Sequence, residues 1–253
     1  MNYFIDPRYA IIKDRLRMVN SIIGFVSNKG GVGKSVIASM TALLLGSKGY
    51  HVGLFDMDFT NPSCHIILGV KDIMPIEEKG IIPPEVHKIK FMSITYYSRD
   101  NPLPLRGHDI TNIILELLAI TRWEHLDFLI LDMPPGLGDE ILDAIRFIEK
   151  LDIIVVTAPS KLSIASASRL VRMIKITRKN ILGIILNENA PSLYNINAIT
   201  STLRDLNIPL LGVIHYDPNL EEALGDCKKL LNTKFRFYVE KCIDKILKEH
   251  FSP

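Results

Sequence analysis

Short apolar runs rich in β-branched residues alternate with segments of helical periodicity from residue 21 to the end of the chain. This alternation predicts parallel strands joined by crossover helices. Several runs are apolar throughout, for example Phe128-Leu-Ile-Leu131 and Ile153-Ile-Val-Val156. Because such strands have no polar face, they need helices on both sides of their sheet. We therefore expect an α/β fold with a doubly wound, mainly parallel sheet flanked by helices.

The expected elements follow from these patterns, with boundaries good to a few residues. The main strands are Ser21–Ser27, His51–Asp56, Leu126–Asp132, Asp152–Ala158, Ile181–Asn187 and Pro209–His215, with one more at Phe91–Ser98. The helices are Lys34–Gly46, Asp109–Trp123, Leu137–Leu151, Ser163–Arg178, Ser192–Leu206 and Thr233–His250.

The length of 253 residues, 47% of them hydrophobic, allows one sizeable core, and we expect a single domain over residues 1–253. Residues 1–20 are expected to form an N-terminal helical extension, because Asp6-Pro7 precedes a helical apolar spacing. This extension either lies on the domain or is a partner-binding arm. Residues 71–104 hold five prolines and are expected to form an irregular excursion with one strand.

Charge and cysteine content exclude several classes of protein. The formal net charge is +2, which gives no strong sign of nucleic-acid or membrane binding. Cys64, Cys227 and Cys242 show no C-x-x-C spacing, so neither a disulfide framework nor a cysteine metal site is indicated. No signal peptide and no apolar run of about 18 residues is present. We expect a cytoplasmic protein.

A glycine-rich loop between the first strand and its helix is the strongest local motif. The glycines let backbone N–H groups surround phosphate oxygens, and the helix N-terminus adds partial positive charge. Lys34 is expected to reach the β and γ phosphates of ATP, and the Ser35 hydroxyl to coordinate Mg²⁺. The expected nucleotide-binding residues of this loop are Asn28, Lys29, Gly30, Gly31, Val32, Gly33, Lys34 and Ser35.

Carboxylates follow two further strands. Asp56 and Asp58 lie at the end of one strand, and Asp132 ends another. Open α/β sheets bind ligands at the carboxyl ends of their strands. Asp132 is expected to hold Mg²⁺ through water, and the amide of Gly136 to sense the γ phosphate. The alternative role for Asp56 and Asp58 is to cap the next turn.

Lys29 is a second lysine at the start of the loop. It resembles the signature lysine of the deviant Walker A class, which includes MinD, ParA, nitrogenase iron protein and Mrp. The resemblance implies that Lys29 reaches across a homodimer interface to the partner's nucleotide. A cation supplied in this way stabilises transition-state charge, an effect on the order of 10³ to 10⁵ in related systems. Dimerisation would then gate hydrolysis, with Lys29, Lys34 and Asp58 as the catalytic residues.

The chain is similar to the Mrp/ApbC branch of this class. The matching blocks are Lys29–Ser35, Asp56–Ser63, Leu105–Gly107 and Trp123–Asp139, and the last contains Asp-x-Pro-Pro-Gly-x-Gly-Asp. The resemblance implies that Asp58 orients the attacking water and that Asp56 supports the metal shell. It also places Asn187 against the adenine, although a turn residue at the end of a strand is the alternative.

The chain departs from that branch at one motif. Mrp-type cluster carriers have a C-x-x-C pair after the strand that ends near Asn187, and two chains hold an iron–sulfur cluster with it. This chain has Asn187-Glu-Asn-Ala-Pro-Ser-Leu-Tyr-Asn195 there. The cofactors we expect are therefore ATP and Mg²⁺, without an iron–sulfur cluster.

Three functions remain open from the sequence. The first is an Mrp-like, Mg-dependent ATPase homodimer that acts with an unknown client protein in metallocluster or metalloprotein assembly. The second is a MinD- or ParA-like positioning ATPase, in which the amphipathic helix Thr233–His250 would bind a membrane. The third is a non-hydrolysing nucleotide-binding adaptor, and Asp58 and Asp132 argue against it.

Overall fold

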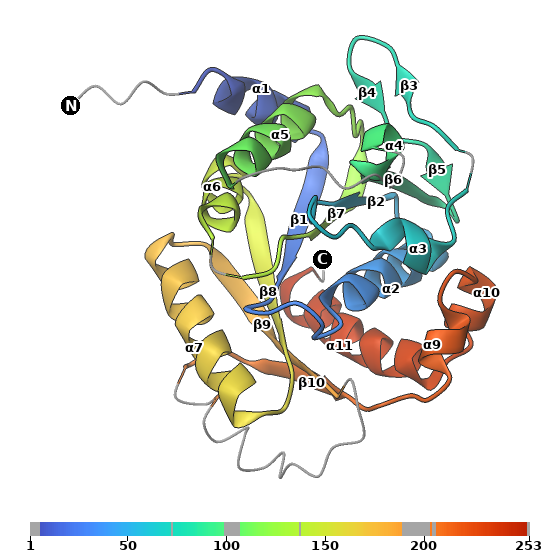
Figure 1. The fold of residues 1–253 in the computed structure, drawn as a ribbon, viewed down its shortest axis with the longest axis vertical. Coiled ribbons are helices and arrows are strands. Elements are labelled where there is room, and N and C mark those ends of the chain that lie inside the picture. Colours follow the sequence, from blue (N-terminus) through green and yellow to red (C-terminus); the bar gives the residue numbers. More distant parts are fainter. Residues whose placement is uncertain are drawn as a thin grey trace.

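The computed structural model describes residues 6–71, 73–98, 107–136, 138–188, 203 and 206–251. An eight-stranded sheet forms its centre (Figure 1), in the order β10 (Leu210–Ile214), β9 (Asn180–Asn187), β8 (Leu151–Thr157), β1 (Val19–Val26), β7 (Leu126–Asp132), β2 (Val52–Asp56), β6 (Ile89–Ser93) and β5 (Glu85–Val86). Every pairing in this sheet is parallel except that of β5 with β6. The predicted doubly wound α/β fold is confirmed.

Helices cover both faces of the sheet. Figure 1 shows α1, α5, α6 and α7 on one side and α2 and α11 on the other. The helices of the described residues are α1 (Arg8–Arg15), α2 (Lys34–Ser47), α3 (Cys64–Leu68), α4 (Thr95–Ser98), α5 (Gly107–Ile120), α6 (Asp139–Phe147), α7 (Lys161–Ile176), α9 (Leu220–Ala223), α10 (Cys227–Leu230) and α11 (Lys234–His250). Because both faces are covered, β7 and β8 are buried along nearly their whole length.

The six main strands lie within two residues of their predicted bounds. The additional strand Phe91–Ser98 is wrong in its second half, because β6 ends at Ser93 and α4 follows. The register explains this end: Ser93 pairs with Asp56, the last residue of β2, so no ladder partner continues beyond it. The predicted helix Ser192–Leu206 and the block Leu105–Gly107 fall almost entirely outside the described residues.

The proline-rich excursion holds more regular structure than one strand. Its β3 (Ile76–Glu77) pairs antiparallel with β4 (Ile81–Ile82), and β5 adds to the edge of the main sheet beside β6. The excursion therefore extends the β2 side of the fold (Figure 1).

The N-terminal helix α1 packs on α5, and its Ile12 is fully buried. The Arg8 guanidinium donates to the side-chain oxygen of Asn112 in α5 at 3.1 Å. The Tyr9 hydroxyl donates to Glu149 at 2.6 Å. Of the two roles open from the sequence, these contacts favour a helix that lies on the sheet's helical layer.

The last helix, α11, packs against β10 and α2. Its apolar face is buried, and consists of Phe235, Val239, Cys242, Ile243 and Ile246. Burial of this face in the core removes the surface that a membrane-binding helix would need. Across the described residues, none of the helices combines the length and hydropathy required for a membrane span.

Gly53 in β2 lies against the fully buried indole of Trp123, and a Cβ added there would approach the ring to 2.8 Å. We expect Gly53→Ala to lower the free energy of unfolding by on the order of 1–3 kcal/mol, as overpacking does. Gly24→Ala in β1 is the matched control, because its nearest neighbour is a flexible Leu151 methyl at 3.2 Å. Chemical denaturation measures the free energy of unfolding of both variants, and an equal decrease in the two would contradict this packing argument.

Candidate nucleotide-binding site

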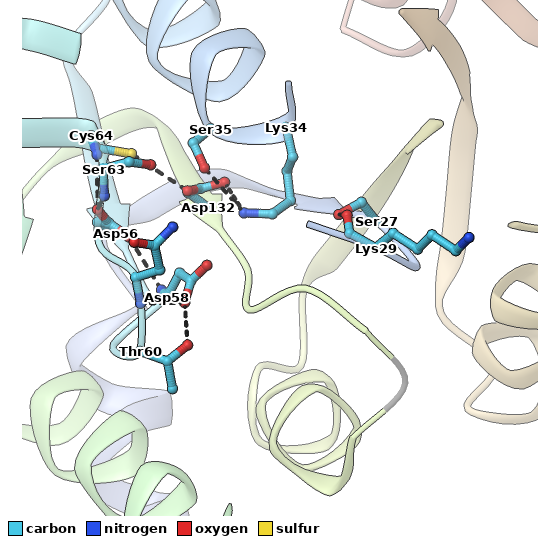
Figure 2. Close-up of polar contacts among 11 residues, drawn as sticks. Ser27, Lys29, Lys34, Ser35, Asp56, Asp58, Thr60, Ser63, Cys64 and Asp132 are labelled. Atoms are coloured by element: carbon cyan, nitrogen blue, oxygen red, sulfur yellow. Dashed lines mark hydrogen bonds and ion pairs between the residues drawn. The ribbon is translucent and has the colours of Figure 1, made fainter. Parts of the chain in front are cut away.

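The predicted site residues gather where β1, β7 and β2 end side by side. Phe25 of β1 pairs with Asp132 of β7, and Asp132 pairs with Asp56 of β2. The glycine-rich loop follows β1 directly, so it lies beside both carboxylates. The parallel pairing of these strands thus brings three distant segments of the sequence together in one site (Figure 2).

The loop adopts the conformation that its glycines allow. Gly31 and Gly33 have φ angles of 77° and 84°, which disfavour side chains. A Cβ on Gly33 would also lie 2.3 Å from the side-chain nitrogen of Asn187. That nitrogen donates to the Val32 carbonyl at 2.9 Å. Buried Asn187 therefore fixes the loop from the end of β9, while its contact with adenine stays a prediction.

Lys34 and Asp132 form a buried ion pair. The Lys34 Nζ lies 2.5 Å from Asp132 Oδ1, and the side chains are 5% and 0% exposed. Burial acts to lower the pKa of Lys34, but the charge and hydrogen bond of Asp132 outweigh it, and the pKa is raised. The same amine donates to the Ser35 hydroxyl at 3.4 Å. Walker A lysine and serine and the Walker B aspartate are therefore in direct contact (Figure 2).

Asp56 holds the loop after β2. Its Oδ2 accepts the backbone N–H groups of Ser63 and Cys64, both at 3.0 Å. Its Oδ1 accepts the N–H of Asp58 at 3.2 Å. Burial and the nearby carboxylate of Asp132 raise the pKa of Asp56 to about 7. Asp56 thus joins an ordered turn to the site and carries a proton more readily than an ordinary aspartate.

Asp58 lies in that turn and is 6% exposed. Its Oδ1 accepts the Thr60 hydroxyl at 2.8 Å and the Asn61 N–H at 3.1 Å. The turn-capping role that was open from the sequence is therefore present. Figure 2 shows the same side chain near Asp56. The catalytic role of Asp58 stays a prediction.

Cys64 is a site residue that the sequence reasoning missed. Its Sγ lies 3.5 Å from Asp132 Oδ2, and ligand atoms of Asp56, Cys64 and Asp132 all lie within 4.8 Å of one another. Burial, followed by the charges of both aspartates, raises the pKa of its thiol well above the ordinary value. The thiol therefore stays protonated. Its only signal in the sequence was its place directly after the Asp56–Ser63 block.

Three predicted residues stand apart from the lysine–aspartate pair. Lys29 is exposed, and Figure 2 shows its side chain pointing away from Lys34. The side-chain nitrogen and oxygen of Asn28 are both buried without a hydrogen-bond partner among the described residues. The Gly136 N–H donates to the Ser27 carbonyl at 2.9 Å, which ties the Walker B turn to the start of the loop.

The chain is similar in sequence to known proteins. The profile of the ParA-type family described as NUBPL iron-transfer P-loop NTPase matches residues 18–250. The chain belongs to this family. The iron-sulfur cluster carrier protein of Rickettsia felis is 35% identical over 84% of the chain, and the chain spans 66% of that relative's length. The cytosolic Fe-S cluster assembly factor Nubp2 homolog 2 of Drosophila yakuba is 31% identical over 86% of the chain and 90% of its own length.

Solved structures agree with the family. A nucleotide-binding protein from Archaeoglobus fulgidus, in complex with ADP, matches with a TM-score of 0.74 and 27% identity over 88% of this chain and 92% of that one. The cell division ATPase MinD of Pyrococcus furiosus shares the fold, with a TM-score of 0.68 and 22% identity over 90% and 99% of the two chains. The predicted resemblance of this NUBPL-family chain to the MinD and ParA class is confirmed.

The raised pKa of Asp56 gives a test of the site's electrostatics. The folded-state pKa of Asp56 lies above the unfolded value, so the contribution of this group to stability falls as pH rises from about 4 to about 7. We expect Asp56→Asn to remove this loss. The thermal midpoint of the variant should therefore rise relative to that of wild type as pH increases from about 5 to about 8. Thermal unfolding across this range measures the gain, and parallel profiles would show that folding does not raise the pKa of Asp56.

Proposed function

We propose that this protein is a Mg²⁺-dependent ATPase that works as a nucleotide-gated homodimer in metallocluster or metalloprotein assembly, with iron–sulfur clusters as the metal cargo of its pathway. The buried Lys34–Asp132 pair at the glycine-rich loop is the observation that carries this proposal. Family membership and relatives named as iron–sulfur cluster carriers and assembly factors support it.

The residues present fit a magnesium nucleotide. An added Cβ on Gly30 would meet nothing within 4 Å among the described residues, so space is open beside this part of the loop for phosphate oxygens. The buried amide of Asn28, which has no hydrogen-bond partner in the described part of the chain, offers a further donor and acceptor. Ser35, Asp56 and Asp132 supply the oxygen ligands that Mg²⁺ prefers, directly or through water. When bound, Mg²⁺ neutralises charge on the β and γ phosphates.

Nucleotide binding would exchange the partners of Lys34. Its buried amine would leave Asp132 for the β and γ phosphates, so its charge would stay paired throughout. Asp132 would then be free to face the metal shell. Asp132 would therefore be paired with Lys34 without a triphosphate and would face the metal shell with one. The Gly136–Ser27 hydrogen bond would transmit this difference to the turn after β7.

Hydrolysis needs two further groups. Asp58 lies in the turn that Asp56 orders, and its carboxylate would orient the attacking water. Lys29 points away from the Lys34 of its own chain, which fits an amine that acts on the nucleotide of a second copy. A cation supplied from the partner would complete the site only in the dimer, and turnover would depend on dimerisation.

The burial of the cysteines favours a role in which this chain acts on a client protein and does not itself carry a cluster. Cys64, Cys227 and Cys242 are all buried. Burial raises the pKa of both Cys227 and Cys242 to about 11, so their thiols stay protonated near neutral pH. Cluster ligands are thiolates. We therefore propose that the ATPase acts on a partner that holds the cluster, although several relatives are named as carriers.

Removal of Lys29 tests the catalytic mechanism. We expect Lys29→Ala to bind ATP as wild type does but to lose turnover by at least about 10³-fold, since the cation in trans is missing. Asp58→Ala should also bind ATP and lose turnover. Lys229→Ala, which removes an exposed lysine of α10, is the matched control and should hydrolyse normally.

ATP titration and phosphate release measure these variants, and sedimentation with ATP measures dimerisation. Binding of ATP without turnover in the wild type would establish the adaptor function instead. Normal turnover in Lys29→Ala would exclude action in trans.

Anaerobic reconstitution with iron and sulfide tests the place of the cluster. We expect no sulfur-to-iron absorption in the wild type, and no difference between wild type and Cys227→Ser, because the buried thiols do not ionise. Iron and sulfide content are measured on the desalted protein. A stable cluster that is lost in a cysteine variant would make this chain a carrier itself.

A further inference from the structure

A second group of metal-ligand side chains lies where β2 and β7 begin, whereas the nucleotide site lies where these strands end. His51 immediately precedes β2, His125 immediately precedes β7, and Asp127 is the second residue of β7. One ligand atom from each of the three lies within 4.8 Å of the other two. The strands β2 and β7 are neighbours and run parallel, so their starting ends hold this group just as their final residues hold Asp56 and Asp132.

We propose that His51, His125 and Asp127 bind a divalent transition-metal ion of the zinc type. Two imidazoles and one carboxylate are a set of ligands that such ions accept, with solvent in the remaining position. Both histidines are exposed, so an ion has direct access from water. The proposal does not depend on nucleotide binding or hydrolysis.

The spacing of the first two ligands already suits a tetrahedral ion. His51 Nδ1 lies 3.3 Å from Asp127 Oδ2. Bonds of 2.0–2.1 Å to a tetrahedral Zn²⁺ place neighbouring ligand atoms about 3.3 Å apart. The ring of His125 stands nearly perpendicular to that of His51, with centroids 6.0 Å apart. A ring nitrogen of this exposed side chain already lies within 4.8 Å of the ligand atoms of both His51 and Asp127.

The carboxylate is held in place independently of any ion. Asp127 Oδ2 accepts the backbone N–H of His51 at 2.8 Å, and Oδ1 is 3.4 Å from the side-chain nitrogen of Asn20. The His51 carbonyl in turn accepts the N–H of Asp127 at 2.8 Å. These bonds fix one histidine and the aspartate relative to each other, so binding costs little ordering of the backbone. An ion here would also join the starts of β2 and β7.

Zn²⁺ competition with a chromophoric chelator, on protein without a histidine tag, tests the site. We expect wild type to bind one Zn²⁺ that His51→Ala and His125→Ala each weaken at least about tenfold, since loss of even an outer partner of a ligand costs about that much. His215→Ala is the matched control. His215 is exposed and 2.8 Å from Glu188, but forms no three-ligand group among the described residues.

The buried cluster at the nucleotide site is the competing metal site, and Cys64→Ser separates the two. We expect this variant to keep the Zn²⁺ that the histidine variants lose. Co²⁺ should give the absorption of nitrogen and oxygen ligands without a sulfur-to-cobalt band. Equal binding by wild type and both histidine variants, or loss of binding in Cys64→Ser, would overturn the proposal.

Discussion

A buried ion pair between Lys34 and Asp132 is the interaction around which the site is built. A buried charge is unfavourable unless an opposite charge is paired with it, so removal of one partner typically lowers stability by about 3–5 kcal/mol. The pair therefore requires β1 and β7 to be neighbours, with the glycine-rich loop folded over the end of β7. The parallel order β8-β1-β7-β2 supplies this arrangement.

The proposed nucleotide binding uses the same pair. In the proposed function a phosphate would replace Asp132 as the partner of Lys34, and the displaced carboxylate would then be available to a metal ion. Asp56, whose pKa is raised to about 7 by burial and by the charge of Asp132, holds the turn that contains Asp58. Burial of Asp56 and the nearby charge of Asp132 therefore both oppose ionisation of this carboxyl. Cys64 shares this cluster only as a protonated thiol, because burial and both aspartates oppose its ionisation.

Local sequence determined much of the fold and the chemistry of the loop. The runs that became β7 and β8 are apolar on both faces, and this could be predicted from the local order of residues. The glycines at 31 and 33 occupy the left-handed backbone angles that the motif requires, because few other residues adopt them. Lys34, Ser35 and Asp132 could be assigned because each follows or ends a recognisable strand.

Tertiary structure decided which of these residues meet and which others join them. Strand register ended β6 at Ser93 and turned the following residues into α4, although their composition suits a strand. Asn187 holds the Val32 carbonyl because β9 ends opposite the loop, a contact between residues 155 positions apart. His51, His125 and Asp127 likewise share one edge only through the pairing of β2 with β7. The sequence alone specified residue types and periodicity, whereas contacts between distant strands depend on register, which no local pattern encodes.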